Sequence, residues 1–351
     1  MTIRALWMTP LLAAAVSLVW AQPAMGSCGA WRNVAAAPGV HGGLFDVSAS
    51  SATDAWAVGS ARAVGSARDR TLAERWNGSV WRRVPTPSPG HSFTRPDVLT
   101  AVVAIAPDDA WAVGRYGRHG VPLLLHWNGV VWLRRALPHA ARHASLSAMT
   151  AVSAGDVWAV GSSRYGITRT LHYDGSRWRV VPAVNRGPHA GFSAVAATSA
   201  HDMWAVGSTP ATLTEHWDGH VWSLVPASRR GGAETGVAAV SPSVAWGVGQ
   251  THHHQMSVID RWDGSTWTTV DTITGYVDLA SIAAASATDA WAVGDATTVH
   301  WDGTTWTPGT ISALLAIAIT SVTHVPPSTA YWAVGFTYHG AYHTPLIEAH
   351  C

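Results

Sequence analysis

Asp54-Ala55-Trp56-Ala57-Val58-Gly59 is the stretch that decides the fold, because the chain repeats it. Four close copies run from Asp109 to Gly114, Asp156 to Gly161, Asp202 to Gly207 and Asp289 to Gly294, and two weaker copies centre on Trp246 and Trp332. The seven tryptophans lie at positions 56, 111, 158, 204, 246, 291 and 332, so the steps run from 41 residues (291 to 332) to 55 residues (56 to 111). A period of roughly 40 to 50 residues is typical of solenoids and propellers.

A second repeated phrase follows each of the first six copies and indicates four short strands per unit. In the first unit it is Trp76-Asn77-Gly78-Ser79-Val80-Trp81, and Asn-Gly or Asp-Gly recurs in the next five units. Such a pair between aromatic or β-branched runs predicts a hairpin with a type I′ turn, in which both central residues need positive φ. Small apolar residues precede each Asp-x-Trp phrase, as in Leu44 to Ala49, and no helical period occurs inside a unit. Seven such units predict an all-β protein, a seven-bladed β-propeller with four-stranded antiparallel blades; an open β-solenoid is the alternative.

The two ends of the mature chain predict how the ring closes. Trp31-Arg32-Asn33-Val34 resembles the fourth strand of a unit, Trp81-Arg82-Arg83-Val84, whereas the seventh unit stops before its own fourth strand. Leu346 to Cys351 matches Thr71 to Trp76, which holds the third strand of the first unit. We therefore expect the N-terminal strand to complete the C-terminal blade, which removes an exposed sheet edge. Residues 27–351 then form a single propeller domain.

Residues 1–26 carry the features of a secretory signal peptide. One positive charge, Arg4, precedes an apolar run from Leu11 to Trp20, and small residues follow. This run is too short to span a bilayer in the mature protein, and no other stretch is long and apolar enough to do so. We therefore expect a secreted, extracellular protein without a membrane span.

The chain has two cysteines, and their positions are expected to flank one hairpin turn. Cys351 takes the place of Trp76, and Cys28 takes the place of Gly78. In an exported chain this predicts a Cys28–Cys351 disulfide at the seam of the ring. The alternative is a lipoprotein anchor at Cys28, but the residues before it match a lipoprotein signal poorly.

Composition limits the classes of function. Charged residues make up 12% of the chain and the formal net charge is +1, so neither nucleic acid nor an anionic membrane is implied as a partner. All 22 basic residues are arginine, which excludes Schiff-base catalysis and phosphate loops that require lysine. We expect no cofactor, and a monomer. Apart from Trp7 and Trp20, the tryptophans recur with the repeat, so we expect them to pack between blades rather than to form a sugar-stacking surface.

The units resemble the blades of secreted propellers in the kelch, Asp-box and tectonin-like families, over essentially the whole mature chain. The resemblance implies the architecture and no particular activity. The Trp-Asp-Gly-x-x-Trp turn, as at Asp263-Gly264, stands where an Asp-box stands, between the third and fourth strands. Its Asp and Gly are adjacent rather than separated by one residue, so a sialidase is not implied and the turn is expected to stabilise the sheet.

One face of the expected propeller gathers the long, irregular segments. The connections between blades and the hairpins between second and third strands open on this face, and variable loops on a rigid scaffold are where binding and catalysis concentrate. Arg, His and Tyr side chains there suit an anionic or hydroxyl-rich ligand, although each could equally be an ordinary solvated loop residue. The expected ligand-binding residues are Arg95, Arg142, Arg186, Arg229, Arg230, His41, His91 and Tyr165. The candidate catalytic residues are Asp97, Glu234, His189, His143 and Tyr276. Asp97 and Glu234 stand at or just before the starts of the expected innermost strands, so we expect them near the channel mouth.

Two histidine patterns need separate interpretation. His252 and His254 would point the same way in an extended segment, but no third ligand stands at a recognisable spacing, so we predict no metal site. His or Arg also occupies one position per unit, before the third-strand Trp or its equivalent. Because this position recurs with the period of the fold, we expect a structural role instead of a ring of ligands. The seven residues are Arg75, His126, His172, His216, Arg261, His300 and His350.

Three classes of function fit this sequence. The first is a secreted binding module that recognises carbohydrate or cell-envelope glycan through the face with the long loops. The second is a secreted carbohydrate-active enzyme at the channel mouth, either a polysaccharide lyase with a His or Tyr base or a glycoside hydrolase with two carboxylates. The third is a scaffold that binds another secreted protein. Because the sequence has no Ser nucleophile elbow, zinc-protease helix or Gly-rich phosphate loop, we favour glycan binding over catalysis.

Overall fold

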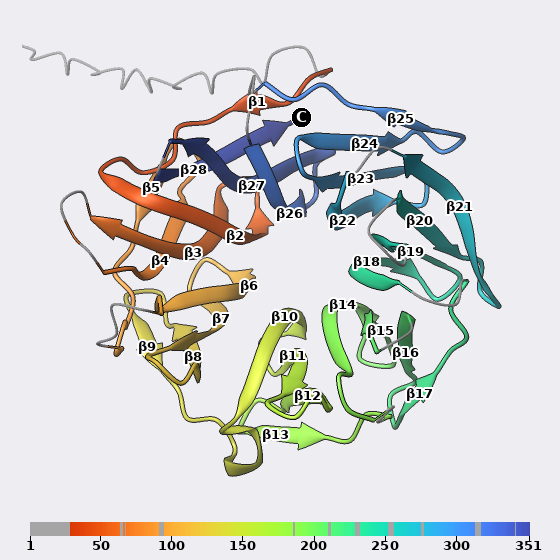
Figure 1. Ribbon diagram of the computed structural model, residues 1–351, viewed down its shortest axis with the longest axis horizontal. Helices are drawn as coiled ribbons and strands as arrows, with labels where there is room; N and C mark the ends of the chain where they lie inside the picture. Colours follow the sequence, from red (N-terminus) through yellow and green to blue (C-terminus); the bar gives the residue numbers. More distant parts are fainter. Residues whose placement is uncertain are drawn as a thin grey trace, which may run out of the picture.

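The computed structural model describes residues 29–63, 66, 68–90, 95–184, 187–209, 212–228, 232–251, 256–274, 277–312, 317–340 and 342–351. Within these ranges the chain forms seven four-stranded sheets arranged in a ring, as in a β-propeller (Figure 1). In each sheet the first strand lies next to the central channel and the fourth lies at the outer rim. The predicted fold class is confirmed. The expected signal peptide, residues 1–26, lies outside the described residues.

The blades follow one another along the chain. Blade one contains β2 (Val40–Ser51), β3 (Asp54–Ala63), β4 (Arg70–Trp76) and β5 (Trp81–Arg83); blade two contains β6 (Val98–Ala106), β7 (Asp109–Tyr116), β8 (Val121–Trp127) and β9 (Trp132–Arg134); blade three contains β10 (Ala144–Ser153), β11 (Asp156–Ser163), β12 (Thr168–Tyr173) and β13 (Trp178–Val181). Blade four contains β14 (Gly191–Ser199), β15 (Asp202–Ser208), β16 (Thr212–Trp217) and β17 (Trp222–Leu224); blade five contains β18 (Ala233–Ser241), β19 (Val244–Gln250), β20 (Met256–Trp262) and β21 (Trp267–Thr274). Blade six contains β22 (Leu279–Ser286), β23 (Asp289–Gly294), β24 (Thr297–Trp301) and β25 (Trp306–Pro308); blade seven contains β26 (Ile317–Val325), β27 (Ala330–His339), β28 (Tyr342–His350) and β1 (Arg32–Asn33). The helical structure in the described ranges is one 3-10 turn, η1 (His139–Ala141), and no helix there has the length and apolar character needed to cross a membrane.

The Asp-x-Trp phrase forms the second strand of each blade, which is buried on both faces. In β3 the side chains of Ala55 and Ala57 belong to a core shared with blade seven, whereas those of Trp56 and Val58 belong to a core shared with blade two. All four side chains are fully buried. A strand that is covered on both faces needs apolar residues at every position, and this explains why the phrase does not alternate between apolar and polar residues.

Gly59 ends the phrase because no side chain fits at its position. A Cβ atom there would stand 2.0 Å from the carbonyl oxygen of Gly43 in β2. The close approach occurs where the pairing of β2 with β3 shifts register between Leu44 and Asp46, which is a β-bulge. The bulge in the inner strand therefore requires glycine at this position. A Cβ atom would clash with a carbonyl oxygen of the inner strand in the same way at Gly114, Gly161, Gly207, Gly294 and Gly335.

The Asn-Gly and Asp-Gly pairs form four-residue loops, and the two-residue type I′ turn expected from the sequence is wrong. Four residues separate β4 from β5. The side-chain oxygen of Asn77 accepts hydrogen bonds from the backbone N–H groups of Ser79 (3.1 Å) and Val80 (3.0 Å). Only Gly78 of the pair has positive φ, at 93°. Because the Asn or Asp side chain satisfies the turning backbone, the left-handed conformation is needed at the glycine alone.

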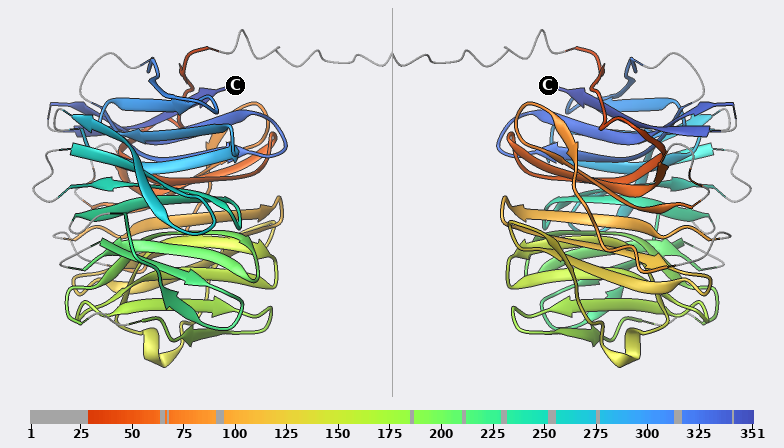
Figure 2. Two further views of the ribbon diagram at one scale, coloured as in Figure 1. Left: turned by 90° about the vertical axis from the view of Figure 1, so that its right-hand side faces the viewer. Right: turned by 90° about the vertical axis from the view of Figure 1, so that its left-hand side faces the viewer.

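The N-terminal strand completes blade seven, as expected. β1 pairs antiparallel with β28, with Arg32 opposite Ala349, and the two strands lie at the same end of the ring when it is seen edge-on (Figure 2). Trp31, just before β1, is buried and packs edge-on against Trp291 of blade six with ring centroids 5.2 Å apart. The N-terminal segment with β1 is therefore held by two blades, through strand pairing with blade seven and through Trp31 against blade six.

Blade seven is offset by one residue from the alignment expected from the sequence. Ala349 is paired with Trp332, whereas the other blades pair their His or Arg with the equivalent Trp. His350, and not Cys351, therefore stands at the position of the third-strand Trp. The register of the long β27–β28 hairpin sets this offset, because a shift by one residue would move every side chain to the opposite face. A disulfide from Cys351 to Cys28 stays a prediction, since Cys28 lies outside the described residues.

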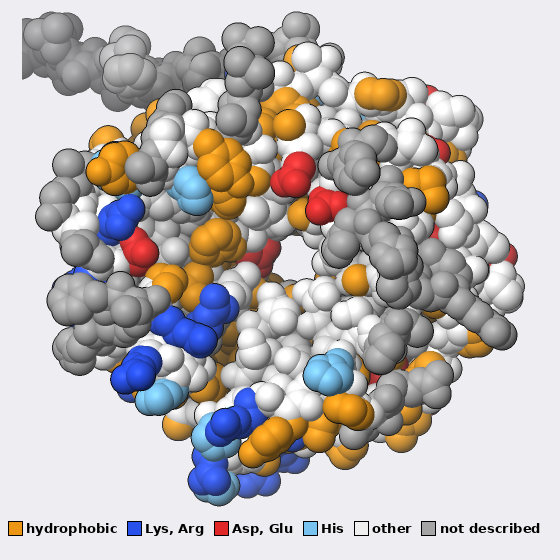
Figure 3. Space-filling view, viewed as in Figure 1, with side chains coloured by type: hydrophobic (Ala, Val, Ile, Leu, Met, Phe, Trp, Pro, Cys, Tyr) orange, Lys and Arg blue, Asp and Glu red, His pale blue; other side chains and the backbone are white. Residues whose placement is uncertain are grey.

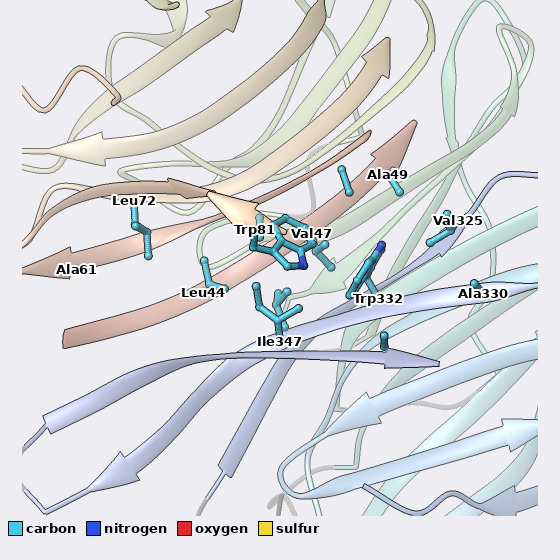
Figure 4. Packing of buried hydrophobic residues seen from close by; sticks show 14 of the residues in the cluster. Leu44, Val47, Ala49, Ala61, Leu72, Trp81, Val325, Ala330, Trp332 and Ile347 are labelled. Atoms are coloured by element: carbon cyan, nitrogen blue, oxygen red, sulfur yellow. The ribbon is translucent and has the colours of Figure 1, made fainter. Parts of the chain in front are cut away.

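The tryptophans form the core between neighbouring blades. Of the nineteen in the described ranges, fifteen are buried and four are half-buried. Trp56 lies against both Trp127 and Trp132 of blade two, with ring centroids 4.9 Å apart in each pair. Figure 4 shows the equivalent packing between blades seven and one, where Trp332 lies close to Trp81. Each such ring removes roughly 150–250 Å² from water, so the repeated aromatic packing is the main source of stability between blades.

Candidate functional site

One face of the disc carries the connections between blades and the hairpins between second and third strands, and we call it the long-loop face. Its described parts include the connection 135–143 and the hairpin 117–120. Figure 3 views the molecule with the mouth of the channel at the centre. Acidic side chains lie near the channel, whereas Arg and His side chains gather towards blades two and three. The basic side chains of this face are therefore concentrated at blades two and three.

The central channel is a cavity of 510 Å³ between the seven inner strands, lined largely by small residues such as Ala104 and Ala151. Asp46 is the one carboxylate in its described lining. This carboxylate accepts hydrogen bonds from the Val102 N–H (2.8 Å) and the Ser321 hydroxyl (2.7 Å), and burial raises its pKa to about 6. Asp46 therefore joins blade one to blades two and seven. The described channel lacks the pair of carboxylates that a glycoside hydrolase uses.

The two candidate catalytic carboxylates lie inside the blades and do not line the channel. Asp97 is buried and accepts hydrogen bonds from the Ser88 hydroxyl (2.8 Å), the Gly90 N–H (2.8 Å) and the Gly117 N–H (3.0 Å). It thereby fastens the connection before blade two to the hairpin of that blade. Glu234 is also buried, beside a small cavity between blades four and five. Both residues stand at or just before the start of an inner strand, close to a shift in its pairing, and neither side chain lines the channel.

The other predicted site residues are spread over the face and do not converge on one site. His41 stacks on Tyr342, with ring centroids 4.6 Å apart. Tyr165 is 70% exposed, with the Arg164 guanidinium 5.5 Å from its ring centroid, and His189 is exposed with a φ of +69°. Also exposed are Arg95, Arg142 and His143. The residues that lie outside the described ranges are His91, Arg186, Arg229, Arg230, Tyr276, His252 and His254. In the part of the chain that is described, no three His, Cys, Asp or Glu side chains are placed to hold a metal ion.

The once-per-blade His or Arg is held by the Asp of the same blade, which gives it a structural role. In five blades the side-chain nitrogen lies 2.6–2.9 Å from the carboxylate oxygen, in the pairs Arg75–Asp54, His126–Asp109, His172–Asp156, His216–Asp202 and His300–Asp289. Each of these His rings also lies against the Trp of the Asp-x-Trp phrase, with ring centroids 4.2–4.6 Å apart. In blade five Val244 replaces the Asp, and the Arg261 guanidinium lies 5.5 Å from the Trp246 ring centroid. The offset of blade seven removes His350 from the set, so the predicted seven become six.

Two adjoining hollows at the outer rim between blades two and three form what we call the arginine groove. The first, of 400 Å³, is lined by Val121, Pro122, Arg134, Arg135, Ala136, Leu137 and Arg142. The second, of 470 Å³, shares Arg135, Ala136 and Leu137 and adds residues that include Arg177. Neither described lining contains Asp or Glu. Of these four arginines only Arg142 was expected from the sequence, although the adjacent pair Arg134-Arg135 at the end of a fourth strand was a visible signal.

Neutral partners orient the arginines of this groove. The Arg134 guanidinium donates a hydrogen bond to the Tyr116 hydroxyl at 2.7 Å and lies 4.8 Å from the centroid of the same ring. Arg135 donates to Nδ1 of His126 at 3.3 Å, and Nε2 of His126 lies 2.9 Å from a carboxylate oxygen of Asp109. Since Nδ1 accepts, the His126 proton is on Nε2 and is donated to Asp109. Hydrogen bonds to uncharged partners thus hold both guanidinium groups in the lining of the groove.

Buried glutamates fasten two of the connections between blades, a role that was not expected from the sequence. Glu74 accepts a hydrogen bond from the Ala37 N–H at 2.9 Å, and Glu215 accepts one from the Val184 N–H at 3.0 Å. Both side chains are fully buried, and burial raises both pKa values to about 7. The signal in the sequence was a single carboxylate two residues before the Trp of a third strand.

No known protein family matches the chain, and no curated protein matches it. Among solved structures, the chain is similar to YCF48 bound to a D1 peptide, with a TM-score of 0.63 and 15% sequence identity over 93% of this chain and 100% of that chain. It is also similar to YCF48 from Cyanidioschyzon merolae, with a TM-score of 0.60 and 15% identity over 92% of this chain and 99% of that chain. This similarity supports the seven-bladed fold. It does not single out the kelch or Asp-box families.

Proposed function

We propose that this protein is a scaffold that binds another protein, and that the arginine groove takes an acidic, extended segment of that partner. The observation that carries the proposal is the lining of the groove, which holds Arg134, Arg135, Arg142 and Arg177 and no carboxylate among its described residues. An anionic segment entering the groove meets positive charge from several sides. Guanidinium groups bind carboxylates through two parallel hydrogen bonds, which gives both affinity and orientation.

The groove also has an apolar wall, which favours a peptide over a small anion. Val121, Ala136 and Leu137 line the same hollows as the arginines. An extended peptide projects successive side chains to opposite sides. Acidic residues of a partner can therefore reach the guanidinium groups while apolar residues between them lie on this wall.

A peptide ligand has more support than a glycan. A solved structure of similar fold, YCF48, holds a bound D1 peptide. Glycan binding often uses exposed aromatic faces, yet no Trp in the described ranges is exposed. The exposed rings of Tyr165, Tyr338 and Tyr342 already contact the side chains of Arg164, Phe336 and His41, respectively. The expectation of glycan binding therefore becomes the competing outcome of the test.

The test is a selection from a random peptide library displayed on phage, run against the purified protein, with a glycan array in parallel. We expect the selected peptides to be rich in Asp and Glu, with apolar residues between them. The variant Arg134→Ala/Arg135→Ala should bind the selected peptides at least about tenfold more weakly, because it removes two charged hydrogen-bonding groups from the groove.

A matched control separates the groove from general attraction by positive charge. Arg62→Ala/Arg82→Ala also removes two positive charges, but from blade one, and should leave peptide binding almost unchanged. Equal losses in both double variants would mean that net charge alone drives binding. Selected peptides without acidic residues, or binding to glycans alone, would overturn the proposal.

A further inference from the structure

The boundary between blades seven and one lacks a side chain that the other boundaries have. In six blades a His or Arg from the third strand covers the Trp of the second strand. In blade seven the same register position holds Ala349, opposite Trp332. The position of the repeated Asp holds Ala330, which is two residues before Trp332. Both members of the repeated polar pair are therefore replaced by methyl groups.

A cavity of 380 Å³ stands where the missing pair would lie. Its walls include Trp332, Ala330 and Ala349 from blade seven, together with Trp76 from blade one. Trp332 and Trp76 lie with ring centroids 5.0 Å apart. The cavity opens on the face of the short turns, because the turns of blade one at residues 52–53 and 78–79 line its edge. It is thus remote from the long-loop face.

The other blades show what kind of group fills this space. His126 lies 4.2 Å from Trp111, His172 lies 4.3 Å from Trp158 and His300 lies 4.5 Å from Trp291, measured between ring centroids. Their interplanar angles are 28°, 16° and 20°, so each ring is stacked on its indole. In blade four the His216 ring is tilted by 50° from Trp204, and in blades one and five an Arg guanidinium lies over the Trp ring. The occupant of each equivalent space is therefore a flat group on the indole, and in three blades it is a ring roughly parallel to the Trp.

The charge around the cavity selects among flat groups. A cation would lack the Asp partner that the His or Arg has in five other blades, since Ala330 stands at that position and no Asp or Glu occurs in the described lining. Arg32 of β1 lines the cavity and is the cross-strand neighbour of Ala349, so its side chain is on the same face of the sheet. These features favour an aromatic ring that carries a carboxylate over a ring that carries an amine.

We propose that this cavity is a binding site for an aromatic carboxylate, whose ring stacks on Trp332 in the place of the missing side chain and whose carboxylate faces Arg32. The site is separate from the arginine groove, so it stands or falls independently of the proposed function. Aromatic rings stacked at such distances contribute beyond the area that they bury.

The probe is 4-fluorophenylacetate, observed by its ¹⁹F NMR signal in the presence of the purified protein, with 4-fluorobenzylamine as the oppositely charged match. We expect the acid to show broadening and a saturable shift, and the amine to show neither. Ala349→His restores the repeated side chain and should lower the affinity for the acid by at least about tenfold, because the imidazole occupies the ring position. Ala330→Leu fills the same cavity from the neighbouring strand and should have the same effect if the histidine variant folds poorly.

A gain-of-site variant gives the reverse test. His300→Ala opens the equivalent space in blade six, where Asp289 remains, and should create a site that prefers the amine. The proposal is overturned if the acid does not bind the native protein, if Ala349→His and Ala330→Leu bind it as well as the native protein does, or if both probes bind equally. Loss of the acid signal in Arg134→Ala/Arg135→Ala, with the cavity variants unchanged, would place the ligand in the arginine groove instead.

Discussion

Replacing Glu74 by glutamine tests whether a buried carboxylate limits the stability of the propeller at neutral pH. The Glu74 side chain is fully buried and accepts a hydrogen bond from the Ala37 N–H at 2.9 Å. Burial raises its pKa to about 7, against an ordinary value of 4.5. Glutamine has nearly the same shape and keeps an oxygen for Ala37, so Glu74→Gln removes the charge and little else.

The sign and size of the effect follow from the raised pKa. Between pH 4.5 and pH 7 the folded protein keeps a proton on Glu74 that the unfolded chain has released. The contribution of Glu74 to the free energy of unfolding is therefore greatest below pH 4.5 and is lost as the pH rises through 7. At about 1.4 kcal/mol per pH unit, the ionised carboxylate lowers the free energy of unfolding by on the order of 3 kcal/mol. Glu74→Gln should therefore be more stable than the native protein by about 3 kcal/mol near pH 8 and by almost nothing near pH 4.

Urea unfolding followed by tryptophan fluorescence, at about pH 4, 6 and 8, measures this difference. Glu215→Gln in blade four provides a second, matched test, since Glu215 is equally buried, accepts one N–H and also has a pKa raised to about 7. Asp108→Asn, at an exposed turn, is the control for removing one acidic group. If the unfolding free energies of the glutamine variants stay parallel to that of the native protein from pH 4 to pH 8, the reasoning from burial is refuted.

Three further predictions concern the seam, the repeated polar pair and the inner strand. A reducing agent should lower the melting temperature of the purified, oxidised protein and Cys351→Ser should remove that sensitivity, because a bridge to Cys28 restricts only the oxidised unfolded chain; a melting temperature that does not change with the reductant would show that no such bridge forms. His126→Phe keeps a flat ring but leaves the Asp109 carboxylate without its donor, so urea unfolding should show a loss of roughly 1–3 kcal/mol, and unchanged stability would make the contact dispensable. Gly59→Ala places a methyl group 2.0 Å from a carbonyl oxygen of β2, so we expect thermal unfolding to show a loss of at least about 2 kcal/mol; a native melting temperature would mean that the inner strand moves aside freely.

The architecture could be predicted because the sequence contains seven copies of the unit that forms one blade. The period of the Trp positions, the Asn-Gly and Asp-Gly turns, and the resemblance of Trp31-Arg32-Asn33-Val34 to a fourth strand together predict a closed ring, and β1 does complete blade seven. The packing of Trp side chains between blades was also predictable, since a residue that recurs with the period of the fold serves the fold. Averaging over many copies makes such inferences robust to any one irregular copy.

Details of single copies could not be predicted in the same way. The register of blade seven depends on the pairing of β27 with β28, and the sequence His350-Cys351 imitates the repeated pattern one residue out of place. Asp97 and Glu234 were placed near the channel by their positions along the chain, but their side chains point into the blades. Near a bulge, the direction of a side chain depends on the local shift in pairing, which a sequence pattern does not express.

The arginine groove was hard to predict because its residues have no common period. Arg134 ends β9 and Arg135 follows it, Arg142 follows the 3-10 turn η1, and Arg177 lies in the outer loop of the next blade. The path of the connection between blades two and three brings them together. Charge at neighbouring points of an irregular surface is a property of the folded chain, and the net charge of +1 for the whole sequence conceals it.

The most direct test of the proposed function is a fluorescence anisotropy titration with one labelled peptide of Asp, Glu and Leu and its counterpart in which Asn and Gln replace the acids. The two peptides have the same length and shape and differ in charge. We predict that the acidic peptide binds the native protein, that its affinity falls as salt is added, and that the amide peptide does not bind measurably. Equal affinities for the two peptides would contradict an arginine groove that recognises acidic segments.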